Sequence, residues 1–424
     1  MSIVLVAVVL TLITTDAAAQ RRLSLADAQR EARAAAPEVA ELEARINGTE
    51  AIVAQAGRRL REDPVVASSI FRGELLGNPD EYTWSVGIRQ PFDFSGSWRA
   101  RLASANADVT RAQFDREAGL RLLDERVAVA VADLAFAQRQ AARAEQLAAL
   151  ARIAADAAHQ QFEVGTAPQI DADAADLDLA AALLALEQTR GLLAQSRTRL
   201  ARLIGSETMT ELIVEDPDEP ADVPSTPPDF APLVDRDPRV RAAMSEVEAA
   251  RLEREVFERL ARGPITFGLD YTRERREIPR GRFSGAALAG GLAANWLDSD
   301  LAFSVTVPLP LFNRQLEPRA RATARILAAE ATLRRVRADV TAELSSAWEA
   351  LVAAARAVQS VSGTAAILDR DVKFVEQAVR AGQFNAITRV ITLRRLEEAG
   401  RRLDLAVRDL RVARAAWARA SGLP

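Results

Sequence analysis

Few residues in this chain could do covalent or metal chemistry. The sequence has no cysteine, one histidine (His159) and three methionines, which excludes thiol nucleophiles, disulfides, thiolate zinc sites and multi-histidine metal cages. It contains no G-x-x-x-x-G-K-[ST] phosphate loop, no H-E-x-x-H and no G-x-S-x-G. The sequence therefore predicts a protein that is not an enzyme, with no catalytic residue, no cofactor and no bound metal.

One acidic cluster stands at a specific place. A break at residues 165–168 is followed at once by four aspartates, Asp171, Asp173, Asp176 and Asp178. Acids at a helix start stabilise its dipole by about 0.3–1 kcal/mol each, whereas acids repeated around a symmetric opening would attract cations. Both interpretations stay open. His159 precedes the break on a charged segment, and without a second histidine it is predicted to be solvated rather than a ligand.

Composition favours close-packed helices. Aromatic residues make up 5% of the chain and charged residues 27%, with a net charge of −4. The basic residues are arginine throughout, apart from Lys373. This balance gives no general reason to bind nucleic acid.

The first residues resemble an export signal. Residues 3–14 are almost wholly apolar, and small residues at 17–19 precede Gln20, which predicts a cleavable signal peptide over 1–19. No cysteine follows, so a lipid-anchored N-terminus is not expected. The alternative is a buried N-terminal helix. No later apolar run reaches 18 residues, so the sequence predicts no transmembrane helix.

The strongest pattern is an internal repeat. Three landmarks recur at a constant offset of 217 residues: Pro91 as Pro308, Gly165 as Gly382 and Gly205 as Gly422. Constant spacing of the two main chain-breaking residue types indicates a tandem duplication.

Each copy has the same order of elements. In the first copy, residues 20–205, a helix (37–62) leads to a strand hairpin (64–92), a long helix (96–163) and a final helix (168–204). In the second, residues 236–424, the matching segments are 236–262, 264–309, 315–380 and 386–421. Leucines seven apart in the final helices predict left-handed coiled-coil packing. The proline-rich stretch 206–235 predicts an extended equatorial connector rather than a helix.

The strands narrow the fold class. Trp84, Val86 and Ile88 alternate with polar residues, as do Phe303 and Val305. This period is typical of a strand between lipid and a wet lumen, and also of a soluble hairpin packed on helices. Four strands cannot close a barrel. Two protomers would give eight strands with a filled interior, and three would give twelve with a lumen; the small inward residues favour twelve.

The predicted fold is therefore mainly α with a small β part. Tandem-duplicated long helical hairpins form a coiled-coil tunnel, and four strands per protomer complete a 12-stranded trimeric transmembrane β-barrel.

Two short stretches carry a family resemblance. Residues 89–96 (RQPFDFSG) and 162–166 (FEVGT) resemble the TolC-type outer-membrane efflux family, and the resemblance spans essentially the whole mature chain. Residues 307–314 (VPLPLFNR) are similar to the heavy-metal (cobalt–zinc–cadmium) branch. The resemblance implies a passive homotrimeric conduit in outer-membrane lipid, with its helical part in the periplasm. It further implies a periplasmic adaptor and an inner-membrane pump of the resistance-nodulation-division type as partners.

The resemblance also implies where the adaptor binds. Its contacts fall on two helix-turn tips, Val164, Gly165 and Thr166 in the first copy and Ala381, Gly382 and Gln383 in the second. Well-studied members carry aspartates after the second tip, where this chain has Thr388 and Ile391.

A candidate gate follows from the two copies. Asp171 and Arg389 follow their turns by under two helical turns, so we predict that they hold the periplasmic entrance narrow. The alternative is that both are solvent-exposed charges worth under about 1 kcal/mol.

Other functions remain open. Metal cations as cargo follow only from the branch resemblance, and the alternative is a drug or small-molecule efflux or type I secretion conduit of the same fold. From other classes, a periplasmic adaptor would have one hairpin within nested β-domains rather than two in tandem. A structural coiled-coil rod would not need amphipathic strands or an export signal.

Overall fold

The chain forms two compact units. The computed structural model describes residues 21–58, 60, 62–72, 82–206, 212–215, 226–277, 295–309, 315–380 and 386–423. Unit 1 comprises Met1–Leu42, Arg116–Asp237 and Ala338–Pro424, and unit 2 comprises Glu43–Asp115 and Pro238–Arg337. The predicted signal peptide, residues 1–19, lies outside the described residues.

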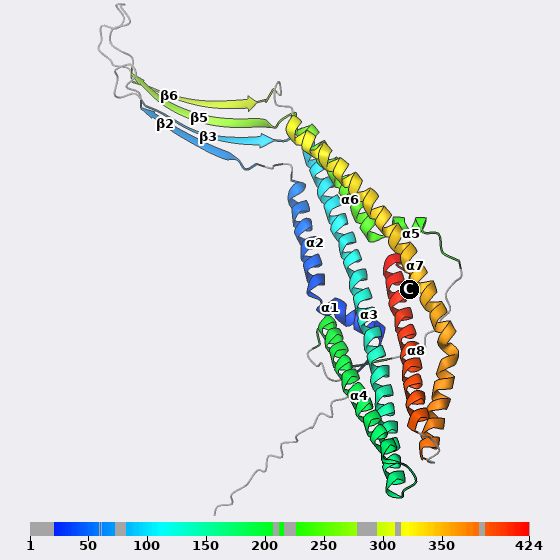
Figure 1. The fold of residues 1–424 in the computed structure, drawn as a ribbon. Coiled ribbons are helices and arrows are strands. Elements are labelled where there is room, and N and C mark those ends of the chain that lie inside the picture. Colours follow the sequence, from blue (N-terminus) through cyan, green and yellow to red (C-terminus); the bar gives the residue numbers. More distant parts are fainter. Residues whose placement is uncertain are drawn as a thin grey trace, which may run out of the picture. The chain divides into compact units, whose positions relative to one another are not determined.

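Long helices dominate both units (Figure 1). Three of them are shared between the units: α2 (Pro37–Ala56), α3 (Ser97–Glu163) and α7 (Leu316–Arg380). Unit 1 also holds β1 (Arg21–Leu23), α1 (Leu25–Ala35), α4 (Gln169–Ile204), β4 (Leu212–Val214), α5 (Ala231–Arg236) and α8 (Ala386–Ser421). Unit 2 also holds β2 (Val65–Arg72), β3 (Tyr82–Phe92), α6 (Pro238–Leu260), β5 (Ile265–Glu277) and β6 (Asn295–Thr306).

The core of unit 1 gathers where short elements meet long helices. β1 pairs in parallel with β4, and buried side chains of both strands, α1, α3 and α4 form one cluster that includes Leu23, Leu134, Leu200 and Leu212. Gly205 ends α4 with φ +65°, and a Cβ there would lie 2.6 Å from the Cβ of Ala35. Small residues and glycine thus allow the close helix packing that the composition suggests.

Unit 2 contains one antiparallel sheet. Its strand order is β2-β3-β5-β6, so the two predicted hairpins join through β3 and β5. β3, β5 and β6 are 11, 13 and 12 residues long, close to the roughly 9–11 residues that a tilted strand needs to cross a bilayer.

The expected long helices and four strands are present, and the differences lie at short elements. The sequence did not predict β1, α1 or β4, and α2 ends at Ala56 rather than at residue 62. The extended connector over 206–235 is wrong at its C-terminal end, where α5 begins at Ala231. A proline in the first turn of a helix lacks only an N–H that would have no partner there, so it permits this start. Residues 207–211 and 216–225 of the connector lie outside the described residues.

Candidate functional site

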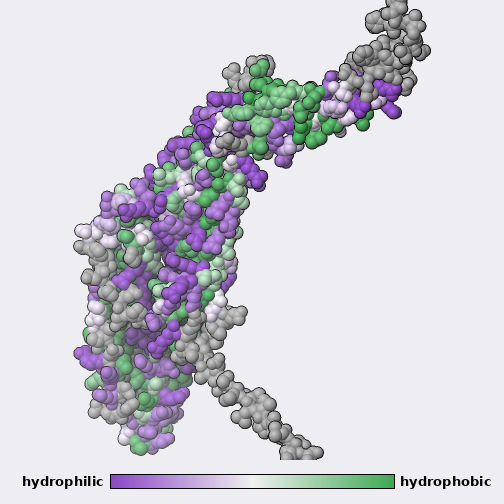
Figure 2. Space-filling model, turned by 180° about the vertical axis from the view of Figure 1, so that it is seen from behind, coloured by the Kyte–Doolittle hydropathy of each residue, from purple (hydrophilic) through white to green (hydrophobic). Residues whose placement is uncertain are grey.

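The sheet of unit 2 has one apolar face. The register aligns Ile88 with Val66 and Leu269, and Leu269 with Phe303. Since side chains alternate between faces, this row lies on one side of the sheet, as do the rows two residues further along the strands in each direction. Ile70, Leu301 and Phe303 are 82%, 70% and 68% exposed. Figure 2 shows hydrophobic side chains gathered over the strands. So large an exposed apolar surface requires another apolar phase or a partner to cover it.

The other face is mainly polar and carries a diagonal ion pair. Gly87 lies opposite Asp270, and Arg89 lies opposite Gly268. An Arg89 guanidinium nitrogen is 3.7 Å from the Asp270 carboxylate. A Cβ at Gly87 would lie 2.0 Å from Oδ1 of Asp270. The two glycines therefore let both charged side chains lie flat on the sheet. Small apolar residues, Ala67 and Ala302, lie in the same row, and β2 adds the larger apolar residues Val65 and Phe71.

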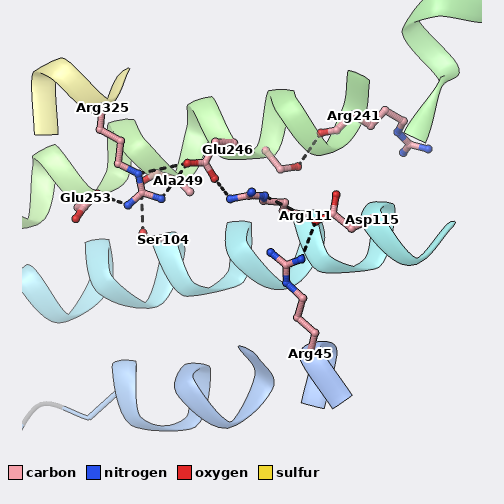
Figure 3. A network of polar contacts seen from close by, with 10 residues as sticks. Arg45, Ser104, Arg111, Asp115, Arg241, Glu246, Ala249, Glu253 and Arg325 are labelled. Carbon is pink, nitrogen blue, oxygen red and sulfur yellow. Dashed lines mark hydrogen bonds and ion pairs between the residues drawn. The ribbon is translucent and has the colours of Figure 1, made fainter. Parts of the chain in front are cut away.

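A ladder of alternating charges joins four helices of unit 2 (Figure 3). Arg325 of α7 lies 3.0 Å from Glu246 of α6, which also pairs with Arg111 of α3. Arg111 and Arg45 of α2 both approach Asp115 at 3.9 Å. These groups are partly exposed, so each pair contributes at most about 1 kcal/mol. Their combined effect is to fix the helices of this unit, and they offer no arrangement for catalysis.

The first predicted tip is a tight turn in unit 1. Gly165 has φ +70°, and the backbone N–H and hydroxyl of Thr166 donate to the Gln161 carbonyl at 2.9 and 3.0 Å. Val164 is 72% exposed. Glycine is favoured here because the left-handed conformation is strained for most other residues. The turn thus holds an apolar side chain out from the helix end.

The candidate gate residues are described unequally. Asp171 is half-buried at the start of α4. Arg389 lies in α8, and its side chain is outside the described residues, as are Ala381, Gly382 and Gln383. The Asp171–Arg389 contact therefore stays a prediction. His159 is exposed as expected, and its Nε2 lies 3.0 Å from the Asp176 carboxylate.

Exposed apolar residues recur along two helices of unit 1. On α4, Ile170, Leu177 and Leu184 are 72%, 73% and 62% exposed at seven-residue spacing. On α7, Ile367 and Phe374 are 48% and 63% exposed at the same spacing. A seven-residue apolar repeat is the seam of a coiled coil, so each helix presents a seam that the described residues of its own protomer leave uncovered.

Sequence reasoning missed a buried carboxylate between α3 and α8. Asp404 is 1% exposed and accepts from Nε and Nη2 of Arg143 at 2.8 and 3.2 Å and from Gln140 at 2.8 Å. Gly400 lies one turn earlier, and a Cβ there would be 2.9 Å from Nη1 of Arg143. A glycine and an aspartate four residues apart inside a leucine repeat were the available signal.

Two findings concern the described residues alone. They contain no group of three or more His, Asp or Glu side chains arranged to hold a metal ion. Within the same part of the chain, no helix has both the length and the apolar character that crossing a membrane requires.

Comparison with known proteins gives one match in sequence, to a family model, and several matches in fold. Residues 16–206 match the family model described as outer membrane efflux protein. The fold matches CusC, studied for its folding and transmembrane channel formation, with a TM-score of 0.71 and 14% identity over 93% of this chain and 91% of that chain. No curated protein matches the chain in sequence.

Two further solved structures share the fold. The outer membrane protein VceC of Vibrio cholerae gives a TM-score of 0.68 and 15% identity over 94% of this chain and 96% of that chain. The open state of the MtrE outer membrane channel of Neisseria gonorrhoeae gives 0.68 and 15% over 94% and 88%. The arrangement of long helices and a four-stranded sheet is thus shared with these solved structures over nearly the whole chain.

Proposed function

Because residues 16–206 belong to the outer membrane efflux protein family and the fold extends that likeness over nearly the whole chain, we propose that this protein is the outer-membrane channel of a tripartite efflux system. It is a transport protein and not an enzyme. In this proposal it conducts passively, receiving cargo from a periplasmic adaptor and an inner-membrane pump of the resistance-nodulation-division type.

The main observation behind the proposal is the state of the two edges of the four-stranded sheet. Within the part of the chain that the structure describes, β2 and β6 each pair with one neighbour, which leaves both outer edges of the sheet open. An unpaired backbone edge in lipid costs several kcal/mol per group, whereas the apolar face suits lipid. Three copies would supply twelve strands, which close the sheet around a lumen lined by the polar face.

The uncovered helix seams support the same assembly. Counted from Gly165, the α4 seam residues lie 5, 12 and 19 positions along the chain; counted back from Gly382, Phe374 and Ile367 lie 8 and 15 positions away. The two sets interleave with alternating steps of three and four, the spacing of coiled-coil packing. We therefore pair α4 of one protomer with α7 of the next, a head-to-tail contact that closes into a ring.

Native mass spectrometry of the detergent-purified protein tests the assembly. The expected species is a trimer, and Leu177→Asp with Phe374→Asp should shift it toward monomer. Arg190→Ala, an exposed change on the same helix outside the seam, is the matched control. A wild-type monomer that stays soluble without detergent would contradict the barrel.

Orientation has its own test. The sequence predicts a loop over about 276–298, and the ends of β5 and β6 shorten it to residues 278–294, which lie outside the described residues. This segment is proposed to be an extracellular loop of the barrel. A tag inserted beside Gly281 should be cleaved by protease added to intact cells. A tag that is protected until the outer membrane is permeabilised counts against this orientation.

Adaptor docking is proposed at the tips. The exposed Val164 beside the rigid Gly165 turn supports the first tip, and residues 381–383 would supply the second. Val164→Asp should abolish efflux in cells while leaving trimer formation and conductance unchanged. Gly165→Asn, which tolerates the left-handed conformation, should keep activity. Wild-type efflux by Val164→Asp would refute docking at this tip.

Asp171 and Arg389 are proposed to narrow the entrance. Planar-bilayer conductance should rise for both Asp171→Ala and Arg389→Ala, with a double variant that is not additive. Wild-type conductance in both single variants would contradict the proposed gate without contradicting the proposed channel.

Metal cations are the proposed cargo, on the resemblance of residues 307–314 alone. Deletion of the protein should then sensitise cells to cobalt, zinc or cadmium. Sensitivity to drugs with unchanged metal tolerance would favour drug or small-molecule efflux through the same fold.

A further inference from the structure

The loop end of the apolar face of the sheet carries arginine and aromatic residues beside the aliphatic residues Ile70 and Leu297. Cross-strand pairing aligns Arg72 with Tyr82 and Tyr82 with Arg275 in one row. In the next row Trp84 is aligned with Arg273. By alternation along each strand, these side chains share the face of Ile88 and Leu269. Three arginines and two aromatic residues thus end the apolar band where β2 leads into residues 73–81 and β5 leads into residues 278–294.

These arginines have no acidic partner in the described part of the chain. Glu274 and Asp300 belong to the polar face, because their positions alternate with those of Arg273 and Arg275 and of their cross-strand partners. No described carboxylate pairs with Arg72, Arg273 or Arg275. The Nε–H of Arg273 is buried and donates to no described atom. Among the residues that the structure describes, this surface therefore concentrates positive charge without a paired carboxylate at one edge of an apolar band.

The spacing suits a single anionic headgroup. Arg273 and Arg275 are two residues apart on one strand, about 7 Å, and Arg72 lies two strand spacings away, about 10 Å. The long arginine stems can lie along apolar surface and turn their guanidiniums toward the aqueous side. Trp84, whose ring packs edge-on against Tyr271 at 5.5 Å, adds the aromatic character of a membrane interface.

Guanidinium groups favour one ligand chemistry above others. Their planar fork binds phosphate oxygens through two parallel hydrogen bonds, which an ammonium group cannot do. At the rim of a lipid-facing surface, the phosphates within reach are those of lipid headgroups.

We propose that Arg72, Arg273 and Arg275 form a binding site for a phosphate-bearing lipid headgroup in the outer leaflet. The site rests on the proposed function, because it needs the apolar face in the membrane with the loop end outward. It would fix the depth of the barrel in the bilayer and attach phosphorylated glycolipid to each protomer. In a trimer the site would occur three times around the outer rim.

Lipid binding to the purified trimer tests the site. The probe is lipid A, a phosphorylated glycolipid, measured by native mass spectrometry against the same lipid with its phosphates removed and against zwitterionic phosphatidylethanolamine. The wild type should prefer lipid A to both. Since each basic residue near a lipid surface contributes about fivefold, the triple Arg→Gln variant should bind lipid A about 100-fold more weakly.

The matched control lies on the same sheet. Arg89→Gln removes one arginine from the opposite, polar face and should leave lipid A affinity unchanged. Equal loss in Arg89→Gln, equal binding of the dephosphorylated lipid, or unchanged affinity in the triple variant would each overturn the site. If the triple variant does not assemble, Arg275→Gln alone should lose about fivefold, and wild-type affinity in that variant would overturn it.

Channel formation separates the two proposals. If the wild type forms channels in planar bilayers and shows no phosphate preference, only the lipid site fails. If the wild type forms no channels and no trimer, the proposed function fails with it.

Discussion

Replacing the buried Asp404 should loosen the contact between α3 and α8. The carboxylate accepts two charge-assisted hydrogen bonds from Arg143 and one from Gln140. Breaking a buried pair by removing one partner costs about 3–5 kcal/mol. Arg143 keeps 32% of its side chain exposed, so water can hydrate it in part, and we expect Asp404→Ala to cost about 3 kcal/mol at the low end of this range.

Hydrogen exchange measures this loss locally, which matters because the chain has two compact units and need not unfold in one step. Where opening is rapidly reversible, about 3 kcal/mol corresponds to roughly 150-fold faster exchange of the α8 amides near residue 404. Asp404→Asn keeps the volume and one acceptor, so its exchange should rise roughly 20-fold. Gly400→Ala should raise it by less, since its Cβ would press on Arg143 at 2.9 Å.

Two controls make the reasoning refutable. Arg402→Ala removes an exposed pair with Glu398 on the same helix, where the side chains are 72% and 64% exposed, and should change exchange no more than about twofold. Arg143→Ala combined with Asp404→Ala should be less than additive, because both remove the same contact. Exchange within threefold of wild type in Asp404→Ala, or strict additivity in the double variant, would refute the account.

Three further outcomes follow from described contacts. Burial raises the pKa of Glu125; the positive charge of Arg419 offsets part of this rise, and the negative charge of Glu343 adds to it. Because the folded protein then binds this proton more tightly than the unfolded chain, the free energy of unfolding should rise as pH falls from neutral through the raised pKa. It should level off below the ordinary value of 4.5. Thermal melts between pH 7 and 4 should lose that rise in Glu125→Gln, and an unchanged slope would contradict the assignment. Gly205→Ala should lower Tm more than Gly165→Ala, because both have positive φ but only Gly205 faces Ala35, at 2.6 Å; the expected costs are about 2 and about 1 kcal/mol, and equal shifts would rule out the steric part. Arg325→Ala removes pairs with two glutamates and should lower Tm by more than Arg321→Ala, which removes one exposed pair; the reverse order would show that the ladder contributes nothing.

Local patterns predicted the large elements. The 217-residue offset predicted two similar halves, and alternation of apolar and polar residues predicted strand hairpins over 64–92 and 264–309, where β2, β3, β5 and β6 lie. These features depend on neighbours within one turn or one strand, so they are visible along the chain. The sequence did not predict the short elements β1, α1 and β4. β1 and β4 are three residues each, and they form only because they pair with each other across nearly two hundred positions.

The candidate surfaces could be predicted from the sequence only in part, because they depend on contacts between distant segments of the chain. The sequence predicted the first tip because a glycine turn is local, and it named Asp171 and Arg389 from spacing alone. It could not pair Asp404 with Arg143, since that contact joins residues 261 positions apart. It also could not align Arg72 with Arg275, or Arg89 with Asp270.

Composition and the internal repeat therefore predicted the mainly helical, duplicated fold, and the tertiary structure determined which charged side chains contact one another. A strand's sequence fixes which residues share a face, because side chains alternate with a period of two. The register between strands then decides their neighbours, and a slip of one residue would move every side chain to the other face. Only the folded sheet set the Arg72–Tyr82–Arg275 row at the loop end, because that register results from the packing of both hairpins together.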